Sequence, residues 1–485
     1  MNVAKIALLI SAFFNIAVQA VYFTHMLQLN SYRPERYRKW CLENDQRIVT
    51  VRRLLPALLI PTMFLPELYG YLVGAAILLV TAFCNFPGKA KKPLVVTARV
   101  KRLFFTETVL TGLVLTVCYF LSHLRALGIV CVLSLLPFLI VGVANYCNLP
   151  VEKGISNHYV NDARKRLRMH NTLTVIGITG SYGKTSTKTF LHALLSVKYN
   201  VLMTPESYNT TMGVVRTIRE RLRPSHQIFI AEMGAKNAGD IREICELVSP
   251  QYGVITSIGE QHLETFKTLD TIISTKFELA DALPENGTLF ACGDNPYITR
   301  RLSQKLPLCP TVLYGLENGE VLVSDVKVSL SGCSFTITIG EQQQVFTTKL
   351  LGTHNIQNLA GCIAVAHRLG IPLKEMVSAV RRLTPVEHRL QLLPNGYIDD
   401  AYNANPAGFR SALDVLKLFD VQRVLVTPGM VELGERQETL NRELGAYAAD
   451  CCDIAVLVGL KQAPPLKEGL LSAGFPENRI FVVPS

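Results

Sequence analysis

The residues best suited to chemistry form a glycine-rich stretch, Gly180-Ser181-Tyr182-Gly183-Lys184-Thr185. An apolar run ending in Gly-Ile-Thr precedes this stretch, and a helix-like sequence follows it. In a loop of this kind, backbone N–H groups and the positive end of the helix surround phosphate oxygens. Lys184 would neutralise the β and γ oxygens, and the Thr185 hydroxyl would hold Mg²⁺. The stretch predicts a nucleoside triphosphate site, although Ile178 stands where the strict Walker pattern has its first glycine.

Two further polar residues stand near the ends of apolar runs, namely Glu232 and His262. Each has an ordinary structural explanation when it is considered alone. A carboxylate at a strand end often caps the next helix, and a lone histidine is usually a core or surface residue. Considered alone, each residue is more simply explained in this way, and a functional interpretation rests on the resemblance described below.

The elements that must position these residues alternate between short β-rich runs and amphipathic helices. The expected elements are a strand at Leu173–Thr179, a helix at Lys184–Val197, a strand at Gln227–Ala231, a helix at Asp240–Val248 and a strand at Val254–Ile258. This alternation predicts a parallel sheet with helices on both faces. The segment 310–350 is β-rich and is expected to extend the sheet.

A second α/β unit is expected from about residue 386. Its predicted elements are a strand ending at Asp400, a helix at Pro406–Leu418, and strands at Val424–Thr427, Ile454–Val458 and Arg479–Val483. The sequence therefore predicts a central ATP-binding domain over 151–385 and a Rossmann-like C-terminal domain over 386–485. Because the chain ends directly after a predicted strand, we expect this last domain to be incomplete or trimmed.

The first 150 residues have a different pattern, with apolar blocks at about 6–24, 54–86, 104–122 and 126–146. A membrane-spanning helix needs roughly 20 apolar residues. The second block is longer and is interrupted by Pro66, Glu67 and Gly70, so it predicts either a hairpin of two short spans or one tilted span with an interfacial piece. Residues 1–150 are thus predicted to form a transmembrane region of four to five helices; a buried bundle of a soluble protein is the alternative.

Charge supports the membrane interpretation and gives an orientation. The formal net charge is +11, and basic residues are concentrated in the stretches 33–53 and 89–102, beside the apolar blocks. This position favours a membrane over nucleic acid as the partner, and by the positive-inside tendency both stretches face the cytoplasm. The link around Arg125 is then outside, and the domains after 150 are cytoplasmic. A basic connector, from Lys153 to Arg168, is expected to contact anionic lipid headgroups.

Twelve cysteines are scattered without a Cys-x-x-Cys pair, which predicts neither a zinc knuckle nor a disulfide framework. Free thiols in a reducing cytosol are the simpler interpretation.

Seven motifs together resemble the Mur ligase superfamily of cell-wall synthesis. They are Thr179–Thr187 (TGSYGKTST), 231–235 (AEMGA), 258–264 (IGEQHLE), 276–278 (KFE), 354–358 (HNIQN), 387–390 (EHRL) and 399–406 (DDAYNANP). The last motif, and 429–435 (GMVELGE), are most similar to the branch that adds D-alanyl-D-alanine to a muramoyl tripeptide. The resemblance implies ATP-dependent joining of a carboxylate to an amine through an acyl phosphate.

The resemblance also implies roles for individual residues. Thr185, Glu232 and His262 would hold two Mg²⁺ ions, and Lys276 would be carbamylated by CO₂ to support them, with Glu278 as a weaker neighbour. Catalytic roles fall to Lys184, Lys276, His262 and Arg389. ATP would be bound by Gly180, Ser181, Gly183, Lys184, Thr185, Ser186, Asn355, Asn358, Arg389 and Asp400. Substrate contacts are expected at Asn209, Thr210, Tyr402, Asn403 and Asn405.

The sequence departs from the family where soluble members carry a domain that grips a uridine nucleotide, because membrane spans stand in that place. The acceptor is therefore expected to be a cell-wall precursor that is nucleotide-linked or lipid-linked, joined to an amino acid or dipeptide. The alternatives are a membrane ligase for another polymer, such as poly-γ-glutamate, and a non-catalytic membrane scaffold for wall enzymes.

Overall fold

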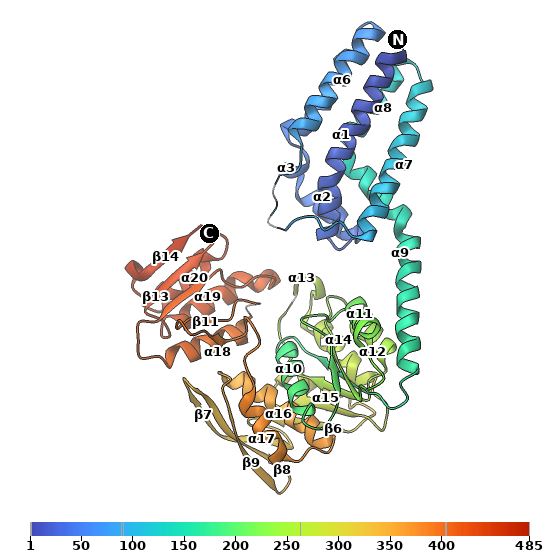
Figure 1. Cartoon of the computed structure of the whole chain (residues 1–485). Helices are drawn as coiled ribbons and strands as arrows, with labels where there is room; N and C mark the ends of the chain where they lie inside the picture. The colour runs from blue at the N-terminus through green and yellow to red at the C-terminus, as the bar shows by residue number, and fades with distance from the viewer. Residues whose placement is uncertain (1, 89, 91, 262, 403–404, 485) are drawn as a thin grey trace. The chain divides into compact units, whose positions relative to one another are not determined.

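The computed structural model describes residues 2–88, 90, 92–261, 263–402 and 405–484. The chain divides into two compact units, Met1–His158 and Tyr159–Ser485, and the long helix α9 (Pro137–Arg168) passes through the division. The predicted boundary near residue 150 lies inside this helix, which continues through Pro150. Figure 1 shows the whole chain.

The first unit is entirely helical in its described part. Its helices are α1 (Asn2–Leu29), α2 (Pro34–Glu43), α3 (Asp45–Ile48), α4 (Val51–Leu54), the 3₁₀ turn η1 (Leu55–Leu58), α5 (Leu59–Thr62), α6 (Glu67–Cys84), α7 (Ala98–Phe120), α8 (His123–Leu135) and the first part of α9. The apolar block 54–86 thus forms α6, preceded by three short turns around Pro56 and Pro61.

Three described helices, α1, α6 and α7, are long and apolar enough to cross a membrane. The number rises to four if α8 and α9, which meet at a bend of 79°, together form one broken span. Hydrogen bonds tie the two basic stretches to the same end of this unit. Gln28, at the end of α1, bonds the carbonyl of Val95 at 2.8 Å, and Asn85 bonds the carbonyl of Arg52 at 3.1 Å.

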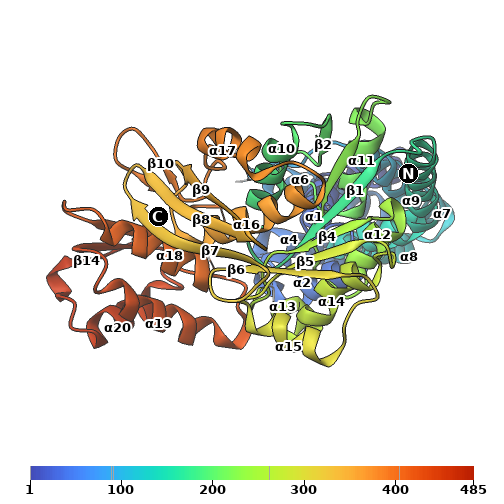
Figure 2. The same cartoon turned by 90° about the horizontal axis from the view of Figure 1, so that it is seen from below.

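The second unit contains a nine-stranded sheet in the order β2-β3-β1-β4-β5-β6-β7-β8-β9. The strands are β1 (Thr174–Thr179), β2 (Val201–Met203), β3 (Ile228–Glu232), β4 (Tyr252–Ile255), β5 (Thr288–Cys292), β6 (Thr311–Gly315), β7 (Val321–Ser329), β8 (Gly332–Ile339) and β9 (Gln342–Thr348). All neighbours from β2 to β7 are parallel, and β7 to β9 are antiparallel. The expected parallel sheet and its β-rich extension are confirmed (Figure 2).

Helices cover this sheet because its central strands are apolar on both faces. β1 and β3 are buried along almost their whole length. The helices of this domain are α10 (Lys184–Leu195), α11 (Thr211–Arg221), α12 (Asp240–Val248), α13 (Leu263–Phe266), α14 (Leu269–Asp281), α15 (Pro296–Gln304), α16 (Thr353–Arg368) and α17 (Leu373–Arg382). The loop after β1 lies where the chain reverses its progress across the sheet, a preferred place for ligands in α/β folds.

The C-terminal part contains a three-stranded parallel sheet, β12 (Val424–Thr427), β13 (Ile454–Val458) and β14 (Ile480–Val483). The helices α18 (Pro406–Lys417), α19 (Gln437–Ala448) and α20 (Ala463–Ser472) accompany it, with two 3₁₀ turns, η2 (Gly434–Arg436) and η3 (Glu477–Arg479). The strand expected to end at Asp400 is instead a small hairpin, β10 (Gln391–Leu392) with β11 (Ile398–Asp399). The predicted strand at 254–258 lies earlier, at β4, so residues 256–258 belong to a loop.

Candidate active site

The glycine-rich stretch connects β1 to α10, as the sequence predicts. Gly183 has a φ of 78° and caps the N-terminus of α10. A Cβ at this position would lie 2.7 Å from Asn358 Oδ1 on α16. Both the left-handed backbone and the lack of space therefore require glycine here. Gly180 is equally crowded, since a Cβ there would lie 2.0 Å from Thr256 Oγ1.

Lys184 bends back over this loop. Its ammonium donates to the carbonyl oxygens of Gly180 at 2.8 Å and Ser181 at 3.1 Å. Burial lowers the pKa of Lys184 to about 8, although the nearby carboxylate of Glu232 opposes this shift. An ammonium held in a loop of N–H donors can neutralise a phosphate that enters the loop.

Glu232 lies at the end of β3 and is almost completely buried. Its Oε1 atom accepts hydrogen bonds from Thr185 Oγ1 at 3.2 Å and from Asn209 Nδ2 at 3.1 Å. The structure thus brings together Thr185 and Glu232, which were predicted as metal ligands, and Asn209, which was predicted as a substrate contact. A hydroxyl and a carboxylate are hard oxygen donors of the kind that Mg²⁺ prefers.

These residues line a cavity of about 890 Å³. Side chains from the following domain complete its wall, in particular Arg389, Asp400 and Tyr402. The Arg389 guanidinium lies 4.1 Å from the centre of the Tyr402 ring, and burial lowers the pKa of Arg389. Burial also raises the pKa of Asp400 to about 6, and this carboxyl accepts a hydrogen bond from the backbone N–H of Leu390 at 3.0 Å.

The other predicted nucleotide-binding residues differ in their positions. Ser181, Ser186 and Asn358 line the same cavity. Asn355 is buried and donates to the carbonyl oxygen of Leu351 at 2.8 Å, and it is not among the residues that line the cavity. Its side chain therefore fastens the start of α16 in this structure.

Two predicted substrate residues have capping contacts at helix starts. Thr210 accepts from the N–H of Gly213 at 3.3 Å and caps α11, and Asn405 accepts from Gly408 at 2.9 Å and caps α18. Asn405 also lines the cavity, whereas Thr210 does not. The predicted sites His262 and Asn403 lie outside the described residues.

Lys276, on α14, is 3% exposed. Burial lowers the pKa of Lys276 well below its usual range, and the charge of Lys184 adds to this effect. A neutral amine is the form that reacts with CO₂, so this environment suits the expected carbamate. Its neighbour in sequence, Glu278, instead accepts from the N–H groups of Gly239 at 2.7 Å and Arg242 at 2.9 Å, and thus caps α12.

The structure places three further contacts around the cavity that the sequence did not identify. Lys188 forms an ion pair with Glu232. The sequence feature that could have indicated this contact is the position of Lys188, one helical turn after Lys184. His354 Nδ1 lies 2.7 Å from Ser411 Oγ and joins α16 to α18, and burial lowers the pKa of His354 to about 4. Arg436 pairs with Glu260. Contacts between separate domains leave no local sequence pattern.

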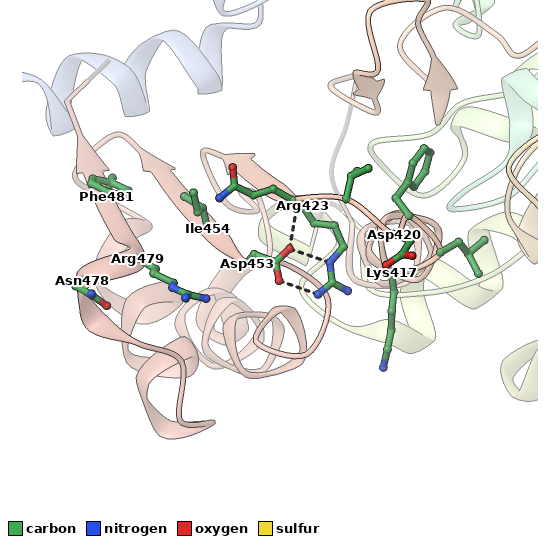
Figure 3. Close-up of a pocket in the computed structure, with 12 residues that line it drawn as sticks. Lys417, Asp420, Arg423, Asp453, Ile454, Asn478, Arg479 and Phe481 are labelled. Carbon is green, nitrogen blue, oxygen red and sulfur yellow. Dashed lines mark hydrogen bonds and ion pairs between the residues drawn. The ribbon is translucent and has the colours of Figure 1, made fainter.

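A second hollow, of about 720 Å³, lies beside the C-terminal sheet (Figure 3). Its prominent charged pair is Arg423 with Asp453, joined by a contact of 2.8 Å between Nη2 and Oδ1. The arginine lowers the pKa of Asp453 to about 2, so the carboxylate is already engaged. This pair connects the starts of β12 and β13, and we assign it a structural role.

Comparison with protein families gives two matches in chain order. Residues 178–366 match the Mur ligase middle domain, and residues 388–484 match the glutamate ligase domain of Mur ligases. The two matched segments contain the glycine-rich loop, Glu232 and Arg389.

Among curated proteins, the chain is 33% identical over 279 residues to the UDP-N-acetylmuramoyl-tripeptide–D-alanyl-D-alanine ligase of Bacillus subtilis. The match covers 56% of this chain and 59% of the relative, so the chain spans less than two thirds of that protein. Among solved structures, MurF from Acinetobacter baumannii is similar with a TM-score of 0.62 and 27% identity, covering 67% of this chain and 71% of the other. MurF from Thermotoga maritima in complex with ADP has a TM-score of 0.60 and 26% identity, covering 67% and 74%.

Proposed function

We propose, since the chain belongs to the Mur ligase family, that this protein is an ATP-dependent ligase that adds D-alanyl-D-alanine or a similar amine to a muramoyl-peptide precursor. The observation that carries the proposal is the single cavity that gathers Lys184, Glu232 and Arg389. The Bacillus subtilis relative shares this part of the chain and is a D-alanyl-D-alanine ligase by name. The DDAYNANP and GMVELGE motifs favour the same amine.

The reaction needs two anions, a carboxylate and the γ-phosphate, to approach each other. A substrate carboxylate oxygen attacks the γ-phosphorus, ADP leaves, and the amine nitrogen then attacks the acyl carbon as phosphate leaves and a proton is lost. Lys184 and Arg389 supply the positive charge that this approach requires. Thr185 and Glu232 would hold Mg²⁺, which when bound supplies further charge neutralisation.

The described residues include no group of three or more histidines, cysteines or acidic residues gathered to hold a metal. Glu232 with the Thr185 hydroxyl is therefore the described part of the proposed Mg²⁺ site. The second proposed Mg²⁺ site depends on His262. A carbamate on Lys276 would add an anion near Lys184, and the burial that lowers the pKa of Lys276 supports that modification.

We further propose that Met1–His158 anchors the enzyme in the cell membrane as a multi-pass region, with the catalytic domains in the cytoplasm. Three or four apolar spans and two basic stretches at one end of the unit support this proposal. An anchored enzyme would have ready access to a lipid-linked acceptor as well as to a nucleotide-linked one.

Phosphate release from ATP by the detergent-purified full chain tests the proposal. The precursors would be nucleotide-linked muramoyl tripeptide, its lipid-linked form and glutamate oligomers, each with D-alanyl-D-alanine or single amino acids. We expect release only when a muramoyl peptide and D-alanyl-D-alanine are both present. Release only with glutamate would indicate polymer synthesis, and no release from ATP-bound protein would indicate a scaffold.

A further inference from the structure

Lys188 lies behind the proposed nucleotide site, where it contacts Glu232 without facing solvent. It is in the second turn of α10, and its side chain is 2% exposed. Its Nζ atom lies 2.9 Å from Glu232 Oε2, and the Glu232 side chain is 1% exposed. Lys188 also donates to the carbonyl oxygen of Glu206. An isolated buried carboxylate is costly, so the Lys188 ammonium offsets the burial of the Glu232 side chain.

The two carboxylate oxygens of Glu232 have different neighbours. Oε2 is paired with Lys188, whereas Oε1 accepts from Thr185 and Asn209. The Thr185 hydroxyl is the group expected beside a metal, so the side of Glu232 that can receive a cation is Oε1. With the Lys188 ammonium beside Oε2, Oε1 is the oxygen on the side of the Thr185 hydroxyl.

Lys188 also holds the loop that carries Asn209. Glu206 has a φ of 44°, an unfavourable backbone conformation for a residue other than glycine. Its carbonyl oxygen is bonded by Lys188 and so points toward the site. The backbone carbonyl of Asn209 in turn accepts from the N–H of Gly234 at 2.7 Å, just after Glu232. One ammonium therefore connects α10, the end of β3 and this loop.

We propose that Lys188 is a positioning residue that restricts Glu232 to binding a metal through one oxygen, and thereby favours Mg²⁺ over Ca²⁺. Mg²⁺ requires near-octahedral geometry at 2.0–2.1 Å, whereas Ca²⁺ accepts bidentate carboxylates at 2.3–2.6 Å. A carboxylate with one oxygen engaged by an ammonium suits the smaller ion. The inference rests on the proposed function, because it assumes that Glu232 is a metal ligand.

The test measures metal selectivity in the full chain in detergent with bound ADP. Mn²⁺ binding is followed by electron paramagnetic resonance, and Mg²⁺ or Ca²⁺ is then added as competitor. Lys188→Met removes the ammonium but keeps an apolar stem of similar length, and Lys188→Arg keeps the charge. Lys349→Met, at an exposed position, is the matched control for loss of one lysine.

We expect Lys188→Met to shift the ratio of Ca²⁺ to Mg²⁺ affinity toward Ca²⁺ by roughly tenfold, the value of one additional charged oxygen contact. Lys188→Arg and Lys349→Met should keep the original ratio. If Lys188→Met does not fold, Lys188→Gln, which is neutral and polar, should show the same direction of change.

An unchanged ratio in a folded neutral variant would overturn the inference. The absence of any protein-dependent Mn²⁺ binding in the unaltered protein would instead overturn the metal site of the proposed function. Since the contribution of ADP to metal binding is common to all variants, it cancels from the comparison.

Discussion

At the scale of single residues, the candidate site places positive groups with different partners close to the glycine-rich loop. Lys184 donates to loop carbonyls, Lys188 pairs with Glu232, and Arg389 approaches from the following domain. Each of these cations has a different partner. Their effects on activity should therefore be separable by substitution.

Lys184→Met should lower the rate of ATP-dependent phosphate release at least about 100-fold, the usual effect of removing one group that stabilises transition-state charge. Lys349→Met, which removes an exposed lysine, should leave the rate unchanged. Phosphate release with saturating precursor is the measurement. A Lys184→Met protein with ordinary turnover would refute the assignment of the phosphate loop.

Nucleotide binding should also show a characteristic pH dependence. In the free protein the pKa of Lys184 is lowered to about 8, so this side chain is largely neutral above pH 8. Bound phosphate favours the ammonium and raises its pKa, so binding at pH 8.5 should take up a proton. Calorimetry of ADP binding in buffers of different ionisation enthalpy should detect uptake at pH 8.5 and far less at pH 6.5. If the number of protons taken up is the same at pH 8.5 and pH 6.5, Lys184 is not their acceptor.

Lys276→Ala should reduce turnover at least about 100-fold, and short carboxylic acids should partly restore it by replacing the expected carbamate. The expectation rests on the burial of Lys276, which lowers the pKa of this amine and so favours the form that reacts with CO₂. Activity is measured with added acetate or formate, with chloride at equal ionic strength as control. Identical rates with acetate and chloride would leave carbamylation without support.

At the scale of elements, several motif residues act by fastening one element to another. Glu278 of α14 caps α12, Thr210 caps α11, and Asn405 caps α18. These contacts fix the starts of three helices. The motifs of this chain therefore combine the groups proposed to act in catalysis with residues that determine local geometry.

Glu278→Ala should destabilise the protein by about 0.5–2 kcal/mol, because two N–H groups at the start of α12 lose their acceptor. Thermal unfolding of the full chain should show a lower midpoint for the loss of this domain. The rate per folded molecule should change much less than in Lys276→Ala. A large loss of rate without loss of stability would indicate that Glu278 acts in the reaction itself.

At the scale of the whole molecule, two independently described units are joined by one chain. The helical unit contains three described helices long and apolar enough to cross a membrane, and the α/β unit contains the segments that match the two Mur ligase domains. Cysteine labelling can test the proposed orientation if exposed positions are used. Cys245 and Cys292 are buried and would resist a reagent on either side, but Cys84 is exposed near the basic end of its unit.

We predict that Cys84 is labelled by a membrane-impermeant maleimide only after cells are permeabilised. Arg125→Cys, at an exposed position in the first turn of α8, should be labelled in intact cells. The Cys84 experiment uses a protein in which Cys41 and Cys147 are replaced by serine. The Arg125→Cys experiment uses a protein in which Cys84 is replaced by serine as well. Labelling of Cys84 in intact cells would reverse the proposed orientation.

The sequence by itself determined the local features of this protein. The glycine-rich loop, the order of strands and helices, and the apolar blocks follow from short-range spacing and periodicity, and β12 and β13 begin and end where predicted. However, Pro56 and Pro61 lie in the short turns that precede α6, and no sequence pattern predicted how these turns pack.

Only the tertiary structure decided which residues meet. The ion pair between Lys188 and Glu232 joins α10 to β3, and the contact between His354 and Ser411 joins two domains. The tertiary structure also shows that the side chains of Asn355 and Glu278 form hydrogen bonds with backbone groups and do not line the cavity. Such pairings depend on the directions of side chains across packed elements, and spacing along one chain does not contain that information.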